Sequence, residues 1–362
     1  MRYYFAVIMM NGMHMNITRK LLPLKQLSIF LVVSLFLFGQ WGQAATETAA
    51  TIINQYATQG SMNAITLQGS KAYIAAGSEG LVVLDVNDHH NLLKLGQFNT
   101  DNYLYEVALS SDGTRAYLAE GKHLVILDIS DPSNILELGR INAGTTGYIE
   151  AVALSPDGKR LYLANGWAGF HILDLSDPEE LKQLGSFSTD SYVGDITVAA
   201  DGTTVYLSDV WKGFIVMNVV DPLQPSAIAQ FAPQSADTGH GFTRDSVLSA
   251  EGSIAYVLDS TDGLLILDIL DPTQPNLLGK LPLTLGVSAG ITLSADGSTV
   301  YIANANYAGA SLIAINVSNP AQATQITQAD FPQAVNVTLS SDESSSYIVG
   351  RSKGFFIIDT LK

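Results

Sequence analysis

The 362-residue sequence contains no cysteine. This absence excludes disulfide bonds, thiol catalysis, iron–sulfur clusters and a lipoprotein anchor. Charged residues are also scarce, at 14% of the chain, whereas hydrophobic residues reach 47% and there are 31 glycines. Disordered chains show the opposite balance, so this composition indicates a globular, strand-rich protein.

Basic residues are fewer than acidic residues. The chain has 18 Lys and Arg residues against 34 Asp and Glu residues, and four of the basic residues but none of the acidic ones precede position 45. The rest therefore carries 14 basic against 34 acidic side chains, a difference of −20. Such a surface repels phosphate, so we expect no nucleic acid partner. Cationic ligands or metal ions suit it better, or the excess only maintains solubility.

The sequence has one long apolar run, LSIFLVVSLFLF at 27–38, and it lies near the N-terminus. Basic residues precede it and small residues follow it, with Ala44 as the last residue before the expected cleavage site. This order predicts a secretory signal peptide over 1–44, read most naturally from a start at Met15. An uncleaved anchor is the alternative. We expect a periplasmic or extracellular bacterial protein with no stable membrane span after cleavage, and a monomer.

A tyrosine within a short apolar stretch recurs along the chain at spacings of 44 to 50 residues. The seven tyrosines are Tyr73, Tyr117, Tyr162, Tyr206, Tyr256, Tyr301 and Tyr347. Periods of this length are typical of propeller blades. In the third copy, an alternating stretch from Ala151 reaches a turn at Asp157-Gly158, a second strand follows around Tyr162, and a third ends before Asp177-Pro178. Asp-Gly favours a hairpin, and Asp-Pro ends a strand.

The two ends of the repeat region predict how the fold closes. The last copy stops after its third strand, whereas an extra strand at 52–57 precedes the first copy and aligns with the fourth strands, such as Leu95 to Phe98. The sequence therefore predicts an all-β fold, a single seven-bladed β-propeller over 45–362 with four-stranded blades. The N-terminal strand completes the last blade and closes the ring.

Several of the third strands resemble a known repeat. The segments GLVVLDV (80–86), HLVILDISDP (123–132), GFHILDLSDP (169–178) and GLLILDILDP (263–272) resemble the LVIVD-repeat proteins of bacteria and archaea. The segment LSPDGKRLYLAN (154–165) is similar to YVTN and lactonase-like propeller repeats. The resemblance implies a propeller, mostly extracytoplasmic, and no particular activity. The fourth, sixth and seventh copies depart from the pattern, with Asn218 and Asn316 in place of the recurring aspartate.

Residues that break the repeat are the candidates for function, because recurring residues, including the aspartate at the end of each third strand, serve the scaffold. Trp167 and Trp211 each follow a repeat tyrosine by five residues, and Tyr307 lies one position further along in its copy. Aromatic side chains at equivalent loops of adjacent blades form a stacking platform for a sugar, a cation or a protein side chain. Alternatively, they wedge between blades.

Acidic residues occupy one inner-strand position in only three copies, as Glu106, Asp195 and Asp245. Because the innermost strands surround the channel, these carboxylates, with Glu150 nearby, are candidate ligands for calcium. Alternatively, they line a wet channel or pair with Arg244. The longest spacing places its extra residues in the loop 232–246, where His240 is the weak candidate for an acid or base. Arg351, in the corresponding loop of the last copy, is a candidate for anion binding.

The sequence contains no GxSxG, HExxH, P-loop or EF-hand string. We therefore expect a non-enzymatic binding or scaffolding propeller that recognises an envelope or extracellular protein, or a small ligand, through one face. The alternative is a metal-assisted, lactonase-like hydrolase using Ca²⁺ or Mn²⁺. A third possibility is an adhesin or envelope spacer without a concave site.

Overall fold

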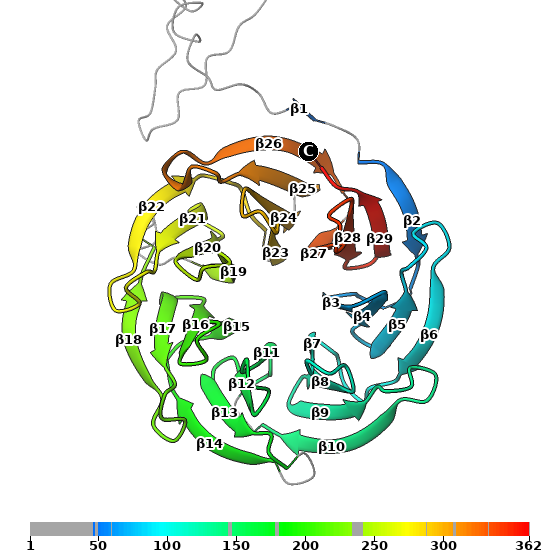
Figure 1. Ribbon diagram of the computed structural model, residues 1–362, viewed down its shortest axis with the longest axis horizontal. Coiled ribbons are helices and arrows are strands. Elements are labelled where there is room, and N and C mark those ends of the chain that lie inside the picture. The colour runs from blue at the N-terminus through cyan, green and yellow to red at the C-terminus, as the bar shows by residue number, and fades with distance from the viewer. Residues whose placement is uncertain are drawn as a thin grey trace, which may run out of the picture. The chain divides into compact units, whose positions relative to one another are not determined.

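The computed structural model describes residues 46–47, 50–58, 60–143, 147–177, 181–233, 242–286, 288–306, 309–331 and 333–361. The chain divides into Met1–Ala44 and Ala45–Lys362, and all described residues belong to the second unit. This unit is a ring of seven antiparallel sheets, as Figure 1 shows. The predicted seven-bladed propeller with four-stranded blades is confirmed. The described residues contain no α-helix and one 3₁₀ turn, η2 (Pro320–Gln322).

Each blade is a meander of four strands that runs from the channel to the rim. The innermost strands are β3 (Ala64–Gln68), β7 (Glu106–Leu109), β11 (Ala151–Leu154), β15 (Val193–Val198), β19 (Thr243–Leu248), β23 (Ser288–Leu293) and β27 (Ala334–Leu339). The second strands are β4 (Lys71–Ala75), β8 (Arg115–Glu120), β12 (Arg160–Ala164), β16 (Thr204–Asp209), β20 (Ile254–Asp259), β24 (Thr299–Asn306) and β28 (Ser345–Gly350).

The outer half of each blade follows in chain order. The third strands are β5 (Leu81–Asp85), β9 (His123–Asp128), β13 (Phe170–Asp174), β17 (Gly213–Asn218), β21 (Gly263–Asp268), β25 (Gly309–Asn316) and β29 (Gly354–Asp359). The outermost strands are β6 (Leu93–Phe98), β10 (Leu136–Asn142), β14 (Lys182–Phe187), β18 (Ser226–Phe231), β22 (Asn276–Leu281), β26 (Thr324–Asp330) and, for the last blade, β2 (Ile52–Tyr56).

The ring closes where the sequence predicts. Strand β2 pairs antiparallel with β29, with Ile52 opposite Ile358 and Tyr56 opposite Phe355 (Figure 1). His89, from the loop after β5 of the first blade, joins that blade to β28 of the last one, because its ring nitrogens form hydrogen bonds with the Tyr347 hydroxyl at 2.8 Å and with Ser345 Oγ at 3.0 Å. A short strand that the sequence does not predict, β1 (Thr46–Glu47), pairs parallel with β26 and extends the sixth blade.

The core lies between the blades. Apolar side chains of each blade pack against the next, and one such layer joins Ile74 and Val82 of the first blade to Phe355 and Ile357 of the last. The seven repeat tyrosines are all buried. The recurring aspartates are structural as predicted: Asp128 Oδ1, for example, accepts the backbone N–H of Ser130 at 2.9 Å. Asn218 does the same for Val220 at 2.9 Å, so this departure from the repeat keeps the turn.

Candidate functional site

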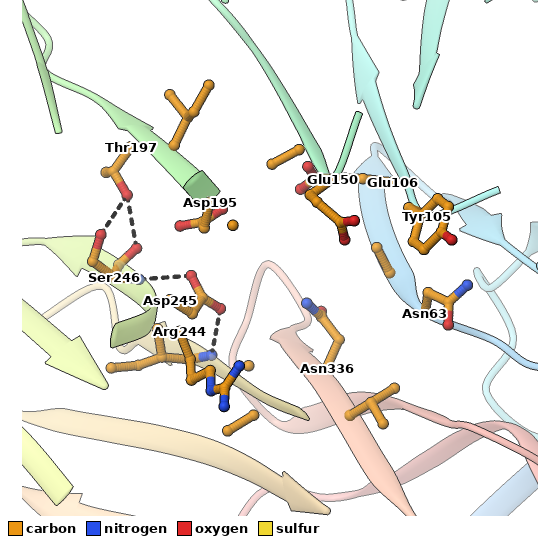
Figure 2. A pocket seen from close by; sticks show the side chains of 18 of the residues that line it. Asn63, Tyr105, Glu106, Glu150, Asp195, Thr197, Arg244, Asp245, Ser246 and Asn336 are labelled. Atoms are coloured by element: carbon orange, nitrogen blue, oxygen red, sulfur yellow. Dashed lines mark hydrogen bonds between the residues drawn. The ribbon is translucent and has the colours of Figure 1, made fainter. Parts of the chain in front are cut away.

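The innermost strands surround a cavity of about 930 Å³, lined by residues of all seven blades. Four carboxyl side chains line it, those of Glu106, Glu150, Asp195 and Asp245 (Figure 2). Two guanidinium groups also line it, those of Arg244 and Arg351. The structure thus brings six of the residues predicted from the sequence to one cavity: Glu106, Glu150, Asp195, Asp245, Arg244 and Arg351.

Local irregularities accompany some of these polar side chains. The pairing of an innermost strand with its neighbour shifts register immediately before Asp195, Asp245 and Asn336. Such a shift bends the strand and changes the direction of the following side chain. Each of these three strands carries a polar group on the cavity wall after the shift, whereas Glu106 lies there on β7, which pairs regularly, and β11, also regular, contributes Ala151.

Two of the three predicted carboxylates share a structural role. Glu106 Oε2 accepts the backbone N–H of Val152 at 2.9 Å, and Asp245 Oδ2 accepts that of Ile291 at 3.1 Å. Each of these two acceptors reaches the innermost strand of the following blade, whose channel side has no neighbouring strand to pair with. Asp245 Oδ1 also accepts the backbone N–H of Ser246 in its own strand at 2.7 Å. Glu106 and Asp245 therefore tie adjacent blades together as well as lining the cavity, and Asp195 lines it between them.

The side chains of Asp195 and Asp245 lie in adjacent blades on the same part of the cavity wall (Figure 2). Two carboxylates that lie near each other in a buried place repel, so ionising both is costly. Burial, followed by the repulsion from Asp195, raises the pKa of Asp245 well above its usual range. Burial also raises the pKa of Asp195. The pair therefore holds a proton more readily than two solvated aspartates would.

Calcium needs six to eight oxygen ligands around one point. Across the described ranges, no three His, Cys, Asp or Glu side chains are grouped so that they could hold one metal ion. One oxygen of Glu106 and of Asp245 already accepts a backbone hydrogen bond from the next blade. The predicted calcium site therefore remains a prediction, and these residues offer it few free oxygens.

The two tryptophans lie in contact on one face of the ring. Their ring centroids are 4.8 Å apart at 47°, and the side chains of Trp167 and Trp211 are 54% and 39% exposed. Residues wedged between blades would be buried, so the arrangement is that of an exposed platform. Asp209 places one of them, because its Oδ1 accepts the backbone N–H groups of Trp211 at 3.1 Å and Lys212 at 2.9 Å.

A chain of contacts joins this platform to the cavity. The ring of Tyr192 meets Trp167 edge-on at 5.6 Å, and the Tyr192 hydroxyl donates a hydrogen bond to Glu150 Oε1. Burial raises the pKa of Glu150, and the hydrogen bond from Tyr192 opposes this rise. Tyr192 and Glu150 both line the cavity (Figure 2 labels Glu150). The platform and the acidic wall are therefore parts of one continuous site.

Of the remaining predicted residues, two are arginines of the cavity lining and two lie outside the described part of the chain. Arg244 donates from Nε to Ser260 Oγ at 2.8 Å, and its guanidinium carbon lies 5.9 Å from the ring of Phe242. Arg351 is exposed and lines the cavity from the last blade. His240 and Tyr307 lie outside the described residues.

Sequence reasoning missed a set of buried polar residues that hold the loops of this face. They occur three residues after the repeat tyrosine, as Glu120, Asn165, Asp209, Asp259 and Asn304. Several bind the loop that enters the innermost strand of their own blade: Asn304 Oδ1 accepts the N–H of Gly286 at 2.7 Å, and Glu120 Oε1 accepts that of Asn102 at 2.6 Å. Their recurrence in otherwise apolar strands is the signal that could have identified them.

Solved structures with the same architecture are numerous. The β-propeller domain of Cps50 (Swd1) from Myceliophteria thermophila is 14% identical, with a TM-score of 0.69, over 86% of this chain and 100% of that one. The periplasmic gluconolactonase PpgL of Pseudomonas aeruginosa is 15% identical, with a TM-score of 0.65, over 83% and 99%. A putative 6-phosphogluconolactonase of Bacteroides uniformis is 16% identical, with a TM-score of 0.65, over 79% and 89%. At these identities the likeness concerns the fold alone.

The closed ring of four-stranded meanders defines the protein as a seven-bladed β-propeller. The repeat itself is the LVIVD repeat, whose family profile matches residues 59–100, 106–143, 146–189 and 245–281. These matches cover the first, second, third and fifth blades, so the chain contains LVIVD repeats. The blades outside the matches are those with the departures noted from the sequence. No curated protein sequence matches the chain. Within the ranges that the structure describes, no helix has the length and apolarity to cross a membrane.

Proposed function

We propose that the protein is a non-enzymatic binding propeller of the bacterial periplasm or cell exterior, which recognises an envelope protein or a small ligand through the face that carries Trp167 and Trp211. One observation carries the proposal: two contacting, exposed indoles stand beside a polar cavity of about 930 Å³. Exposed aromatic pairs are costly to leave in water and are enriched at recognition sites. The cavity is of the size that small ligands occupy.

The location is supported by the apolar run at 27–38 and the small residues before Ala45. Fractionation of the source cells, followed by N-terminal sequencing of the recovered protein, tests it. We expect the protein in the periplasm or medium with a new N-terminus at Ala45. Recovery in the cytoplasm with an intact N-terminus would refute this part of the proposal.

Capture of partners from an envelope extract tests the binding role. The bait is the full gene product, and the test variant carries Trp167→Ala and Trp211→Ala together. Leu270→Ala is the matched control, because Leu270 is a 78% exposed apolar side chain in a loop joining third and fourth strands, at the opposite end of the blade. We expect the tryptophan variant alone to lose the partner. Equal capture by all three proteins would overturn the role of this face and favour a spacer without a concave site.

A metal-assisted hydrolase is the second candidate, favoured by the presence of Glu106, Asp195 and Asp245 in the lining of one cavity. Carboxylate-bound Ca²⁺ or Mn²⁺ would supply Lewis-acid chemistry there. Elemental analysis of the purified protein and melting temperatures with and without added Ca²⁺ or Mn²⁺ decide this candidate. A retained divalent ion, or a melting temperature raised by several degrees, would support it. The absence of both effects would remove it.

A further inference from the structure

The cavity is short of positive charge. Its described lining contains the four carboxyl groups of Glu106, Glu150, Asp195 and Asp245, the guanidinium groups of Arg244 and Arg351, and no lysine or histidine. Carboxylates that share a confined space repel one another, and burial adds to the cost of ionising them. A ligand that brings positive charge into the cavity would relieve both costs.

The carboxyl groups are spread along the wall and do not meet at one point. They come from the innermost-strand regions of four consecutive blades, the second to the fifth (Figure 2). In the part of the chain that the structure describes, no three of them form a group suited to a metal ion. A small ion therefore neutralises such a wall poorly. A ligand with several positive charges held apart by a flexible chain matches it better.

A further feature of the wall suits an organic cation. Tyr103, Tyr105 and Tyr192 line the cavity next to the carboxyl groups, and the faces of such rings attract ammonium groups. The apolar edges of the same rings can lie against the methylene groups of a ligand chain.

We propose that the cavity binds an aliphatic polyamine, whose separated ammonium groups contact the carboxylates of the second to fifth blades while its methylene groups lie against the tyrosine rings. This inference rests on the proposed binding function and names the ligand class of the same site. The contact between charged donors and carboxylates supplies the affinity, since such hydrogen bonds are about twice as strong as neutral ones.

Titration calorimetry on the full gene product, at pH 8 and in 150 mM NaCl, tests the proposal. The probe is spermidine, the uncharged comparator is 1,8-octanediol, and CaCl₂ is titrated separately. The test variant carries Glu106→Gln and Asp195→Asn, because each substitution removes one charge and keeps the size of the side chain, and a Gln amide oxygen can still accept the Val152 N–H. The control carries Asp131→Asn and Asp271→Asn, exposed turn residues whose replacement removes the same charge from the chain.

We expect spermidine to bind, the diol to give no heat, and the test variant to lose affinity about tenfold to hundredfold. The control variant should stay within about twofold of the native protein. Wild-type affinity should also rise between pH 5 and pH 8, because burial raises the pKa of Asp195 to about 6 and that of Glu106 to about 8, so both groups gain charge over this range. Glu150, Asp245 and the guanidinium groups of Arg244 and Arg351 face the same cavity. Circular dichroism and the melting temperature show whether each variant is folded.

Three results would overturn the inference: no spermidine binding, equal losses in the test and control variants, or displacement of spermidine by Ca²⁺ at equal concentration. The third would identify a metal site instead. The partner capture with the tryptophan variant is independent of these titrations. If that capture succeeds and spermidine does not bind, the ligand class is wrong while the proposed binding function stands.

Discussion

Replacing Asp195 with asparagine should stabilise the protein at neutral pH. Burial raises the pKa of Asp195 from 3.8 to about 6. Since one pKa unit corresponds to about 1.4 kcal/mol, ionising a fully buried group with this shift would cost about 3 kcal/mol. Asp195 is only half-buried, because it faces the cavity, and solvent screening reduces the expected gain to about 1–2 kcal/mol.

The sign of the pH dependence follows from the raised pKa. A group that binds its proton more tightly in the folded state contributes most below its unfolded pKa, about 4 for aspartate. That contribution is lost as the pH rises through the folded pKa, about 6. Native stability should therefore fall between about pH 4 and pH 7 at this site, and Asp195→Asn should remove that part of the fall.

Urea unfolding at pH 4.5 and pH 7.5, followed by tryptophan fluorescence, measures the effect. We expect the variant to have a higher midpoint than the native protein at pH 7.5, and the difference to disappear or reverse at pH 4.5. Asp157→Asn is the matched control, because the pKa of that exposed turn carboxyl is lowered by hydrogen bonds to Ser155 and to the backbone of Lys159. The control should be less stable than the native protein at pH 7.5. A lower midpoint for Asp195→Asn at pH 7.5, or an equal difference at both pH values, would refute the reasoning.

Three further substitutions test the packing that supports the site. Gly96→Ala should lower stability by about 1–3 kcal/mol in urea unfolding, because the new Cβ would lie 1.7 Å from a backbone oxygen of the next blade, while Gly194→Ala, with its nearest atom at 3.8 Å, should be close to neutral. His89→Ala should cost about 1–2 kcal/mol through its two hydrogen bonds to the last blade, and an unchanged melting temperature would show that the contact between the first and last blades does not need them. Arg140→Ala should cost about 3 kcal/mol, since it leaves the buried carboxylate of Glu120 without its ion pair; a cost reduced by about half in Arg140→Lys would confirm that charge matters there.

The repeat made most of the fold predictable. Once Tyr73 and its counterparts set the period, the Asp-Gly turns and the incomplete last copy determined the blade number and the closing strand. Strand β1 was not predictable, because two residues pairing with the edge of the sixth blade leave no periodic signal. A repeat in the sequence reveals only those strands that occur in every blade, and β1 occurs once.

The sequence predicted which residues belong to the candidate site, but not which of them are in contact. The register of the repeat placed Trp167 and Trp211 at equivalent loops, and Asp195 and Asp245 at equivalent strand positions. Whether such side chains touch depends on the rotation between blades and on the register shifts before both aspartates. Sequence spacing contains neither quantity, nor does it link Tyr192 to Glu150, which lie 42 positions apart.

The pair of strands that closes the ring has a mechanical consequence. Strands β2 and β29 are antiparallel, and Ile52 lies opposite Ile358, so the incoming end of one strand and the outgoing end of the other are at the same end of the ladder. Tension applied through the two ends of the propeller would therefore break the hydrogen bonds of this pair one after another, because the load acts on only one of them at a time. Under such a load we expect β1 to leave the edge of the sixth blade and the last blade to part, while the first five blades keep their sheets.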